Sequence, residues 1–164
     1  MTHNVFVGIG SNVDRERNIL TGLDALREHF GDLKLSGIYE SVPVGVVGAR
    51  NYYNLVAGFE SDLSPVQINN LLKKIEKKAG QRDKRNCPLD IDLLLFDDLV
   101  DRSFGLNIPR EDITEYAYVA IPLAEIAGDQ LHPETGESFG KSCQSDKIAI
   151  QKVWRSDFQH LGEM

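Results

Sequence analysis

The sequence predicts an α+β fold, an antiparallel sheet with helices packed on it. Two observations predict this. Four segments have the apolar pattern of strands, and two segments with helical spacing of apolar residues separate them in the order β-α-β-β-α-β. That order is the ferredoxin-like arrangement, in which both helices pack on one face of the sheet. The chain has 164 residues, so we expect a single domain, residues 1–164, with additions at its C-terminal end.

The first part of the chain provides a strand, a helix and a second strand. Residues 4–10 (NVFVGIG) place an apolar side chain at every second position, which predicts a strand. Residues 14–30 predict a helix because their apolar side chains recur at helical spacing, and Gly31 follows as a stop signal. Residues 33–41 predict the second strand.

A loop then leads to a third strand and a second helix. Residues 42–51 contain one proline and two glycines, which indicates a long loop, and residues 53–60 predict a strand. The next helix begins at Ser64 and Pro65, because serine is a favourable N-cap and proline suits the first helical position. Gly80 marks its end.

The remaining elements are a basic loop, a fourth strand and a third helix. Residues 81–88 (QRDKRNCP) form the polar loop, and residues 89–96 (LDIDLLLF) predict the strand. Residues 116–126 predict a helix interrupted near Pro122. The last thirty or so residues show no pattern that assigns them.

The composition excludes several classes of protein. The net charge of −7 provides no basic field for nucleic acid, and no apolar run approaches the roughly 20 residues that span a membrane. The two cysteines form neither a metal cluster nor a disulfide framework. The N-terminus has no signal-peptide pattern, so we expect a cytoplasmic protein.

Two aspartates stand at the start of the predicted fourth strand. Alternate residues of a strand point to the same side, so Asp90 and Asp92 project together while Ile91 points the other way. Close carboxylates repel each other unless a cation lies between them, and Mg²⁺ binds one or two carboxylates together with substrate phosphate oxygens. The alternative is a charged, solvent-facing edge strand.

A basic stretch precedes the acidic pair. Arg82, Lys84 and Arg85 supply cations beside the two carboxylates, and a metal-bound polyphosphate needs both kinds of group. The sequence contains no Walker-type glycine-rich loop, so a nucleotide would be held in another way. The alternative is a solvated charged loop without a ligand.

Seven segments carry a family resemblance, in order over about the first 130 residues. They are GIGSN (8–12), IYESVPVG (38–45), NYYNLV (51–56), IE (75–76), LDIDLLLF (89–96), IPRED (108–112) and IPLAEIAG (121–128). The ordered set resembles the 6-hydroxymethyl-7,8-dihydropterin pyrophosphokinases of folate biosynthesis. The resemblance implies transfer of the β,γ-diphosphate of ATP to the hydroxymethyl group of a pterin, with AMP leaving. It also implies ATP as co-substrate, two Mg²⁺ ions, a pterin substrate and a monomer.

The resemblance also implies roles for single residues. Asp90 and Asp92 match the metal-binding aspartates, and Glu76 and Arg82 match positions near the nucleotide. Asp90, Asp92 and Arg82 are therefore the expected catalytic residues. Arg85 and Arg110 are further candidates for the nucleotide; the residues expected to contact the pterin are Ser41, Val42, Val44, Tyr52, Asn54 and Tyr118. Without the resemblance, Tyr52 and Tyr118 also fit ordinary residues at the edge of the core.

The chain departs from the family pattern at three positions. Cys87 and Tyr116 stand where arginines are typical, and Arg110 stands where histidine is common. An arginine aimed at phosphoryl charge can be worth a factor of about 10³. The alternatives are therefore a divergent paralogue with altered or lost transfer activity, a pterin-binding protein, or a ferredoxin-like regulatory module. Cys87 itself is expected to be a small filler rather than a reactive thiol.

Overall fold

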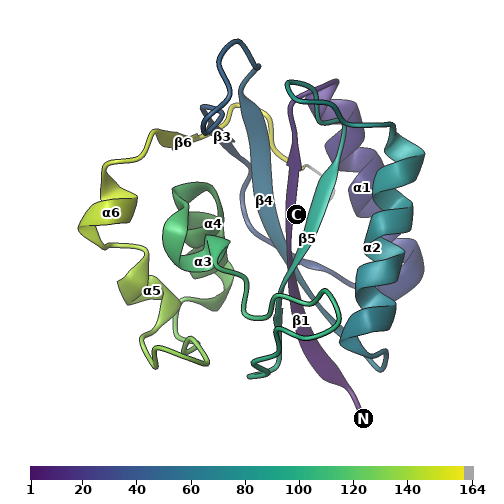
Figure 1. Cartoon of the computed structure of the whole chain (residues 1–164), viewed down its shortest axis with the longest axis vertical. Coiled ribbons are helices and arrows are strands. Elements are labelled where there is room, and N and C mark those ends of the chain that lie inside the picture. The colour runs from purple at the N-terminus through teal and green to yellow at the C-terminus, as the bar shows by residue number, and fades with distance from the viewer. Residues whose placement is uncertain (161–164) are drawn as a thin grey trace.

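A computed structural model describes residues 1–160, and an antiparallel sheet forms its middle layer (Figure 1). Within these residues the strand order is β5-β1-β4-β3-β6, with the short β2 also paired to β4. The strands are β1 (His3–Ser11), β2 (Lys34–Leu35), β3 (Tyr39–Ser41), β4 (Tyr52–Ser61), β5 (Asp90–Phe96) and β6 (Val153–Arg155). Every pair of neighbouring strands is antiparallel. The predicted ferredoxin-like α+β fold is confirmed.

One face of the sheet is covered by α1 (Arg15–Phe30) and α2 (Pro65–Ala79). Their buried faces pack with the inward side chains of the central strands in the larger apolar core. The predicted start of α2 is confirmed in detail. The Ser64 hydroxyl accepts from the Gln67 backbone N–H at 3.2 Å, and the Gln67 side chain accepts from the Ser64 N–H at 2.9 Å, a capping box.

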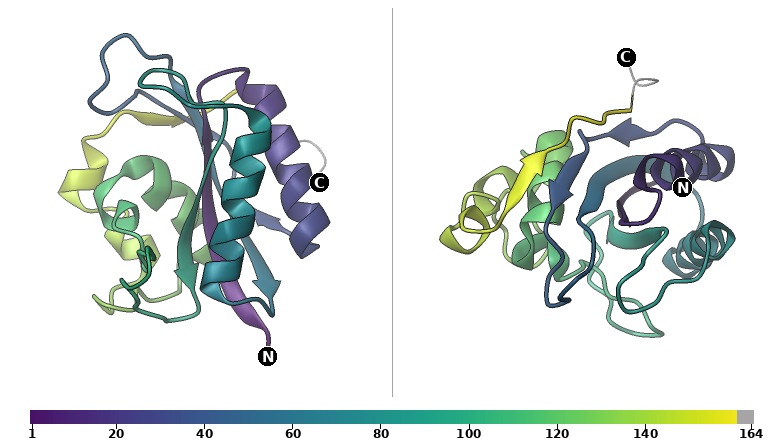
Figure 2. Two further views of the ribbon diagram at one scale, coloured as in Figure 1. Left: turned by 45° about the vertical axis from the view of Figure 1, so that its right-hand side comes forward. Right: turned by 90° about the horizontal axis from the view of Figure 1, so that it is seen from above.

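The opposite face is covered by the C-terminal helices, as the two views of Figure 2 also show. These helices are α3 (Asp112–Glu115), α4 (Ala117–Ala127), α5 (Phe139–Ser142) and α6 (Asp146–Ala149). A second apolar cluster lies between α4 and the sheet, where Val56 and Leu95 meet Leu123 and Phe139. Because β4 is buried on both faces, the sheet is the middle of three layers.

Two sequence expectations need correction. The strand predicted at 33–41 is two short strands, β2 and β3. Leu35 of β2 pairs with Ala57 of β4, and Tyr39 of β3 pairs with Asn54. Between these pairs, three residues (36–38) lie opposite only two residues of β4 (55–56). This extra residue is a bulge. The helix predicted with a break near Pro122 is the continuous α4. Packing of α4 against the sheet offsets the roughly 3 kcal/mol that an internal proline costs a helix.

The segment that the sequence left unassigned adds α5, α6 and β6. Strand β6 extends the sheet beyond β3, so the C-terminal part of the chain contributes to the same sheet as its N-terminal part. Within residues 1–160 no helix has the length and apolar character needed to cross a membrane.

Candidate active site

A pocket of about 230 Å³ lies at the end of the sheet where β1, β4 and β5 meet the loops 42–51 and 81–88. It lies on the face of the sheet that α4 covers, and Tyr118 and Val119 of α4 also line it. Predicted site residues from four separate parts of the sequence line it: Ser41, Val42, Val44, Tyr52, Asn54, Arg82, Arg85, Asp90, Asp92 and Tyr118. The fold therefore brings together residues that the sequence could only nominate one at a time.

The acidic end of the pocket is built on the first residues of β5. Ile91 is fully buried in the core under α1 and α2, so Asp90 and Asp92 project to the other side, as predicted. Opposite them in register lie Gly10 and Gly8 of β1, which also line the pocket. Glycine at these positions leaves space above the strand, since a Cβ at Gly10 would lie only 3.0 Å from Asn54 Oδ1.

Glu76 completes an acidic cluster with the two aspartates. Its Oε2 accepts a hydrogen bond from the Ile91 N–H at 2.7 Å, which ties α2 to the start of β5. Oxygens of Glu76, Asp90 and Asp92 lie within 4.8 Å of one another. Burial and the neighbouring charges of Asp92 and Glu76 raise the pKa of Asp90 to about 8. Such a concentration of carboxylates favours a divalent cation.

Cationic side chains surround this cluster. Arg82 Nη1 lies 3.2 Å from Asp90 Oδ1, and Arg110 Nε lies 3.8 Å from Asp92 Oδ2. Lys73 Nζ lies 3.1 Å from Glu76 Oε2 and 3.7 Å from Asp92 Oδ1. Glu76 is thus part of the acidic cluster and Arg110 is in contact with it, although neither residue lines the pocket itself.

Sequence reasoning missed two residues of this end. Lys73 precedes Glu76 by one helical turn, so the i,i+3 spacing was the signal that would have placed it on the same face. Asp112 lines the pocket and lies 3.4 Å from Arg110. It belongs to the IPRED segment, yet no sequence pattern pairs it with Arg110.

The other end of the pocket, around Ser41 and Asn54, is polar, and the neighbouring rings of Tyr52 and Tyr118 also interact electrostatically with Asp90 of the acidic end. Asn54 Nδ2 donates to Ser41 Oγ at 2.7 Å, and both residues are buried. Tyr52 lies two residues away on β4, and burial raises its pKa to about 12, so it is a neutral phenol at physiological pH. Tyr118 is stacked on Tyr116, with ring centroids 5.2 Å apart and planes at 17°.

Two valines of the 42–51 loop border the same end. Val42 and Val44 are 45% and 60% exposed, which is unusual for large apolar side chains beside a pocket. Together with the aromatic rings, they make this end suitable for a flat, partly apolar ligand with polar edges.

Cys87 lies beneath the pocket rather than in it. Its side chain is buried, and its backbone N–H and C=O are both bonded to Asn12, at 2.6 Å and 3.0 Å. Burial and the nearby Asp90 raise the pKa of the thiol to about 11, so it is protonated and unreactive at neutral pH. The expectation of a small filler is confirmed.

Comparison with known proteins shows the family to which the chain belongs. Residues 6–128 match the family described as 7,8-dihydro-6-hydroxymethylpterin-pyrophosphokinase (HPPK). The 2-amino-4-hydroxy-6-hydroxymethyldihydropteridine pyrophosphokinase of Aquifex aeolicus is 33% identical over 133 residues, covering 79% of this chain and 83% of the relative. The enzyme of that name from Bacillus subtilis is 29% identical over 161 residues, covering 94% and 92%.

A solved structure agrees on the fold. The Plasmodium falciparum HPPK-DHPS crystal structure with pteroate superposes with a TM-score of 0.68 at 15% identity over 87% of this chain. This chain spans only 42% of that longer protein. The family match, the relatives and the fold lead to one conclusion: the chain belongs to the 7,8-dihydro-6-hydroxymethylpterin-pyrophosphokinase family, whose members transfer pyrophosphate from ATP to the pterin in folate biosynthesis.

Proposed function

We propose that the pocket between β1, β4, β5 and α4 is the place where this pyrophosphokinase transfers pyrophosphate from ATP to 6-hydroxymethyl-7,8-dihydropterin. The observation that carries the proposal is that one pocket has two chemically different ends. The acidic end around Asp90 and Asp92 suits a metal-bound polyphosphate, and the polar, aromatic end around Asn54 suits a heterocycle. The two ligands then meet where the ends join.

The carboxylates of Glu76, Asp90 and Asp92 fit a magnesium site. Their oxygens are close enough to share a cation, and burial together with the neighbouring carboxylates of Asp92 and Glu76 raises the pKa of Asp90 to about 8. Asp90 and Asp92 would hold Mg²⁺, two ions in our proposal, with ATP phosphate oxygens filling the rest of the coordination. Bound Mg²⁺ would offset the charge of the phosphates during transfer.

The protein's own groups position the two substrates. We assign the pterin to Ser41, Asn54 and Tyr118: the buried amide and hydroxyl present polar groups to its edge, and the aromatic ring packs on its face. Tyr52, Val42 and Val44 line the rest of this end. The pterin hydroxymethyl oxygen then attacks the β-phosphorus, the bond to the α-phosphate oxygen breaks, and AMP leaves.

Cations of the 81–88 loop compensate for the family arginine absent at position 87. Arg82, Lys84 and Arg85 line the pocket, so three positive charges face the proposed triphosphate from one loop. Arg82 is in contact with Asp90 and is the proposed catalytic cation, while Arg110 balances Asp92 and Asp112. The Cys87 side chain is buried beside Tyr52 and Asp90 and carries no positive charge, so in our proposal the charge is supplied from neighbouring positions.

We also propose that residues 1–164 are one domain and that the chain acts as a monomer in the cytoplasm. The shared sheet of the N- and C-terminal parts supports the single domain. Light scattering of the purified chain at assay concentration tests the monomer, and a dimer mass would contradict it.

The direct test is release of AMP from ATP in the presence of Mg²⁺ and 6-hydroxymethyl-7,8-dihydropterin. We expect AMP and pterin diphosphate in equal amounts, and no AMP when Mg²⁺ is removed with a chelator. Pterin binding without AMP release would contradict the proposed activity and favour a binding protein.

A further inference from the structure

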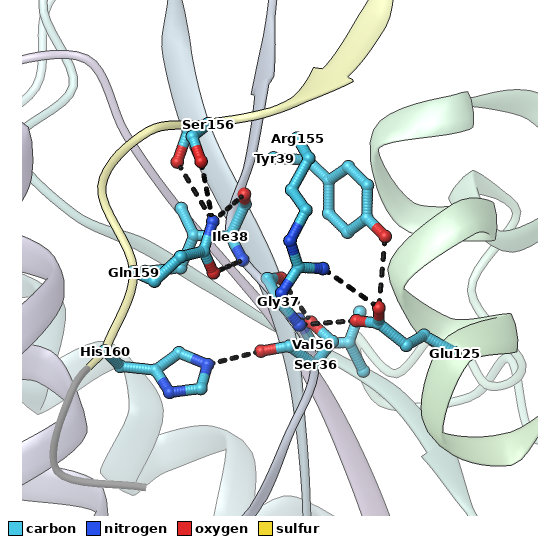
Figure 3. Close-up of polar contacts among 10 residues, drawn as sticks. All are labelled: Ser36, Gly37, Ile38, Tyr39, Val56, Glu125, Arg155, Ser156, Gln159 and His160. Carbon is cyan, nitrogen blue, oxygen red and sulfur yellow. Dashed lines mark hydrogen bonds and ion pairs between the residues drawn. The ribbon is translucent and has the colours of Figure 1, made fainter. Parts of the chain in front are cut away.

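The C-terminal residues 153–160, which we call the C-terminal clasp, lie along the outer edge of β3 (Figure 3). Within the clasp, β6 pairs antiparallel with β3, so that Tyr39 faces Arg155 and Ser41 faces Val153. Strand β3 is only three residues long and carries Ser41 into the pocket. The clasp therefore covers the one edge of this short strand that β4 does not.

Gln159 of the clasp bonds to the bulge where β2 ends and β3 begins. Its Oε1 accepts from the Ile38 N–H at 2.8 Å, and its Nε2 donates to the Ile38 carbonyl at 3.0 Å (Figure 3). The same Nε2 donates to the Ser156 carbonyl at 2.8 Å, and the Ser156 N–H donates to Ile38 at 3.0 Å. The carboxamide thus replaces the strand neighbour that a bulged residue lacks.

Side chains on either side of Gln159 hold the rest of the bulge. His160 Nε2 lies 2.5 Å from the Ser36 carbonyl oxygen. Glu125 of α4 accepts from the Gly37 N–H and from Arg155 Nη1, the latter at 3.1 Å. A Cβ at Gly37 would lie 2.2 Å from Arg155 Nη1, so the bare glycine leaves the space that the guanidinium fills. Every residue of the bulge is bonded to a partner outside β4.

The bulge decides which residues of β3 and β4 are neighbours. Because the three bulge residues 36–38 lie opposite only two residues of β4, Tyr39 lies opposite Asn54 and Ser41 opposite Tyr52. In this register Ser41 Oγ is 2.7 Å from Asn54 Nδ2. A shift of one residue would turn Ser41 to the other face of the sheet. The position of the Ser41–Asn54 pair therefore depends on the bulge being held.

A second contact of the clasp lies on the other face of the sheet, where Tyr53 belongs to the larger apolar core. Phe158 is stacked on Tyr53, with ring centroids 5.6 Å apart and planes at 15°. Arg15 lies 3.7 Å over the Tyr53 ring and donates to the Asn51 carbonyl at 3.2 Å, the residue that precedes β4. The clasp thus also supports the end of the 42–51 loop.

We propose that the C-terminal clasp is a positioning device for the pterin end of the pocket, with Gln159 as its central positioning residue. The clasp touches no reacting group and lies outside the family match, which ends at residue 128. It acts by holding the bulge that sets Ser41 against Asn54. This inference rests on the proposed assignment of the pterin to that pair.

Gln159→Glu is the sharpest test because it keeps the shape and replaces the donor Nε2 by an acceptor facing the Ile38 and Ser156 carbonyls. We expect the KM for the pterin at saturating MgATP to rise on the order of tenfold, because the bulge loses the two part-buried hydrogen bonds that Nε2 donates. The Kd of MgATP measured without pterin should stay within about twofold, because the acidic end is anchored by α2 and β5.

Three further variants make the result decisive. Asp157→Ala, an exposed change inside the clasp, is the matched control and should leave both constants unchanged. Gln159→Ala removes the carboxamide without adding charge and should give the same selective loss. Asn54→Ala tests the pterin assignment itself.

The outcomes separate the two proposals. Selective loss of pterin affinity in both Gln159 variants supports the clasp. Equal loss of pterin and MgATP affinity in the Gln159 variants, with a lower melting temperature, would show that Gln159 has a merely structural role and would overturn the clasp proposal. If Asn54→Ala weakens pterin binding and neither Gln159 variant does, the clasp inference alone is wrong. If Asn54→Ala does not change pterin binding, the assignment of the pterin to Ser41 and Asn54 is wrong, and the clasp inference that rests on it is wrong as well.

Discussion

The two ends of the pocket are built in different ways. The acidic end comes from a few residues of β5 and one side chain of α2, and the Glu76–Ile91 hydrogen bond joins the two elements. The proposed pterin end is lined by β3, β4 and α4, and the C-terminal clasp pairs with the outer edge of β3. The carboxylates of the first end come from two elements that follow each other in the chain, whereas the second end combines segments that are far apart in the sequence.

This difference predicts how each end responds to change. A substitution at the acidic end removes charge from a fixed framework, so the loss is chemical and leaves the fold intact. A substitution near the pterin end acts on strand register and loop position as well, so distant residues such as Gln159 matter there. Four variants, ordered from the largest expected effect to the smallest, test the contrast.

Asp92→Asn removes one charge of the acidic cluster at nearly constant shape. We expect kcat/KM to fall by about 10³ or more, because the proposed metal loses a carboxylate ligand. The same carboxylate also offsets the positive charge of Arg110. Rates of AMP release at saturating Mg²⁺ measure this, and Mg²⁺-dependent ATP binding should fall in parallel. Asp98→Asn, an exposed change beyond the end of the same strand, is the control. Activity within about tenfold of the parent would remove the metal assignment.

Asn54→Ala removes the buried amide at the pterin end. We expect the pterin KM to rise by about 10- to 100-fold, because Ser41 loses its partner and the ligand loses a polar contact. Steady-state kinetics at saturating MgATP measure the change. An equal rise in the KM for ATP would show that the two ends are not independent and would break the comparison.

Arg82→Gln tests the loop cation that is in contact with Asp90. Its side chain is 59% exposed, and Lys84 and Arg85 line the same pocket, so we expect a fall in kcat of about tenfold rather than complete loss. Lys77→Gln, on the exposed side of α2, serves as the charge control. A loss as large as that of Asp92→Asn would mean that the neighbouring cations do not share the phosphate charge.

Cys87→Ala should have the smallest effect. The thiol is buried and protonated, so we expect activity within about twofold and a loss of stability of about 1 kcal/mol from the small cavity. Thermal melting and AMP release measure the two effects. Fast alkylation of Cys87 in the folded protein at pH 8 would contradict the thiol pKa of about 11 on which this prediction rests.

The local features of the fold were predictable from the sequence. The alternating pattern of β1, the Ser64–Pro65 start of α2 and the paired aspartates of β5 each depend on residues close in the chain. The break between β2 and β3 was not predictable, because the pattern of residues 33–41 suits a continuous strand. Gln159 and Glu125 supply hydrogen-bond partners to its bulge from more than eighty residues away, which no local pattern reveals.

For the site, the chemical groups could be identified from the sequence alone: two carboxylates on one side of a strand, preceded by cations, and a set of segments typical of a pyrophosphokinase. Which residues meet depends on the tertiary structure. It joined Lys73 and Glu76 to the aspartates, paired Arg110 with Asp112, buried Cys87 and set Ser41 against Asn54. The physical reason is that side-chain alternation is a local property, whereas strand register, bulges and helix packing depend on contacts between distant parts of the chain.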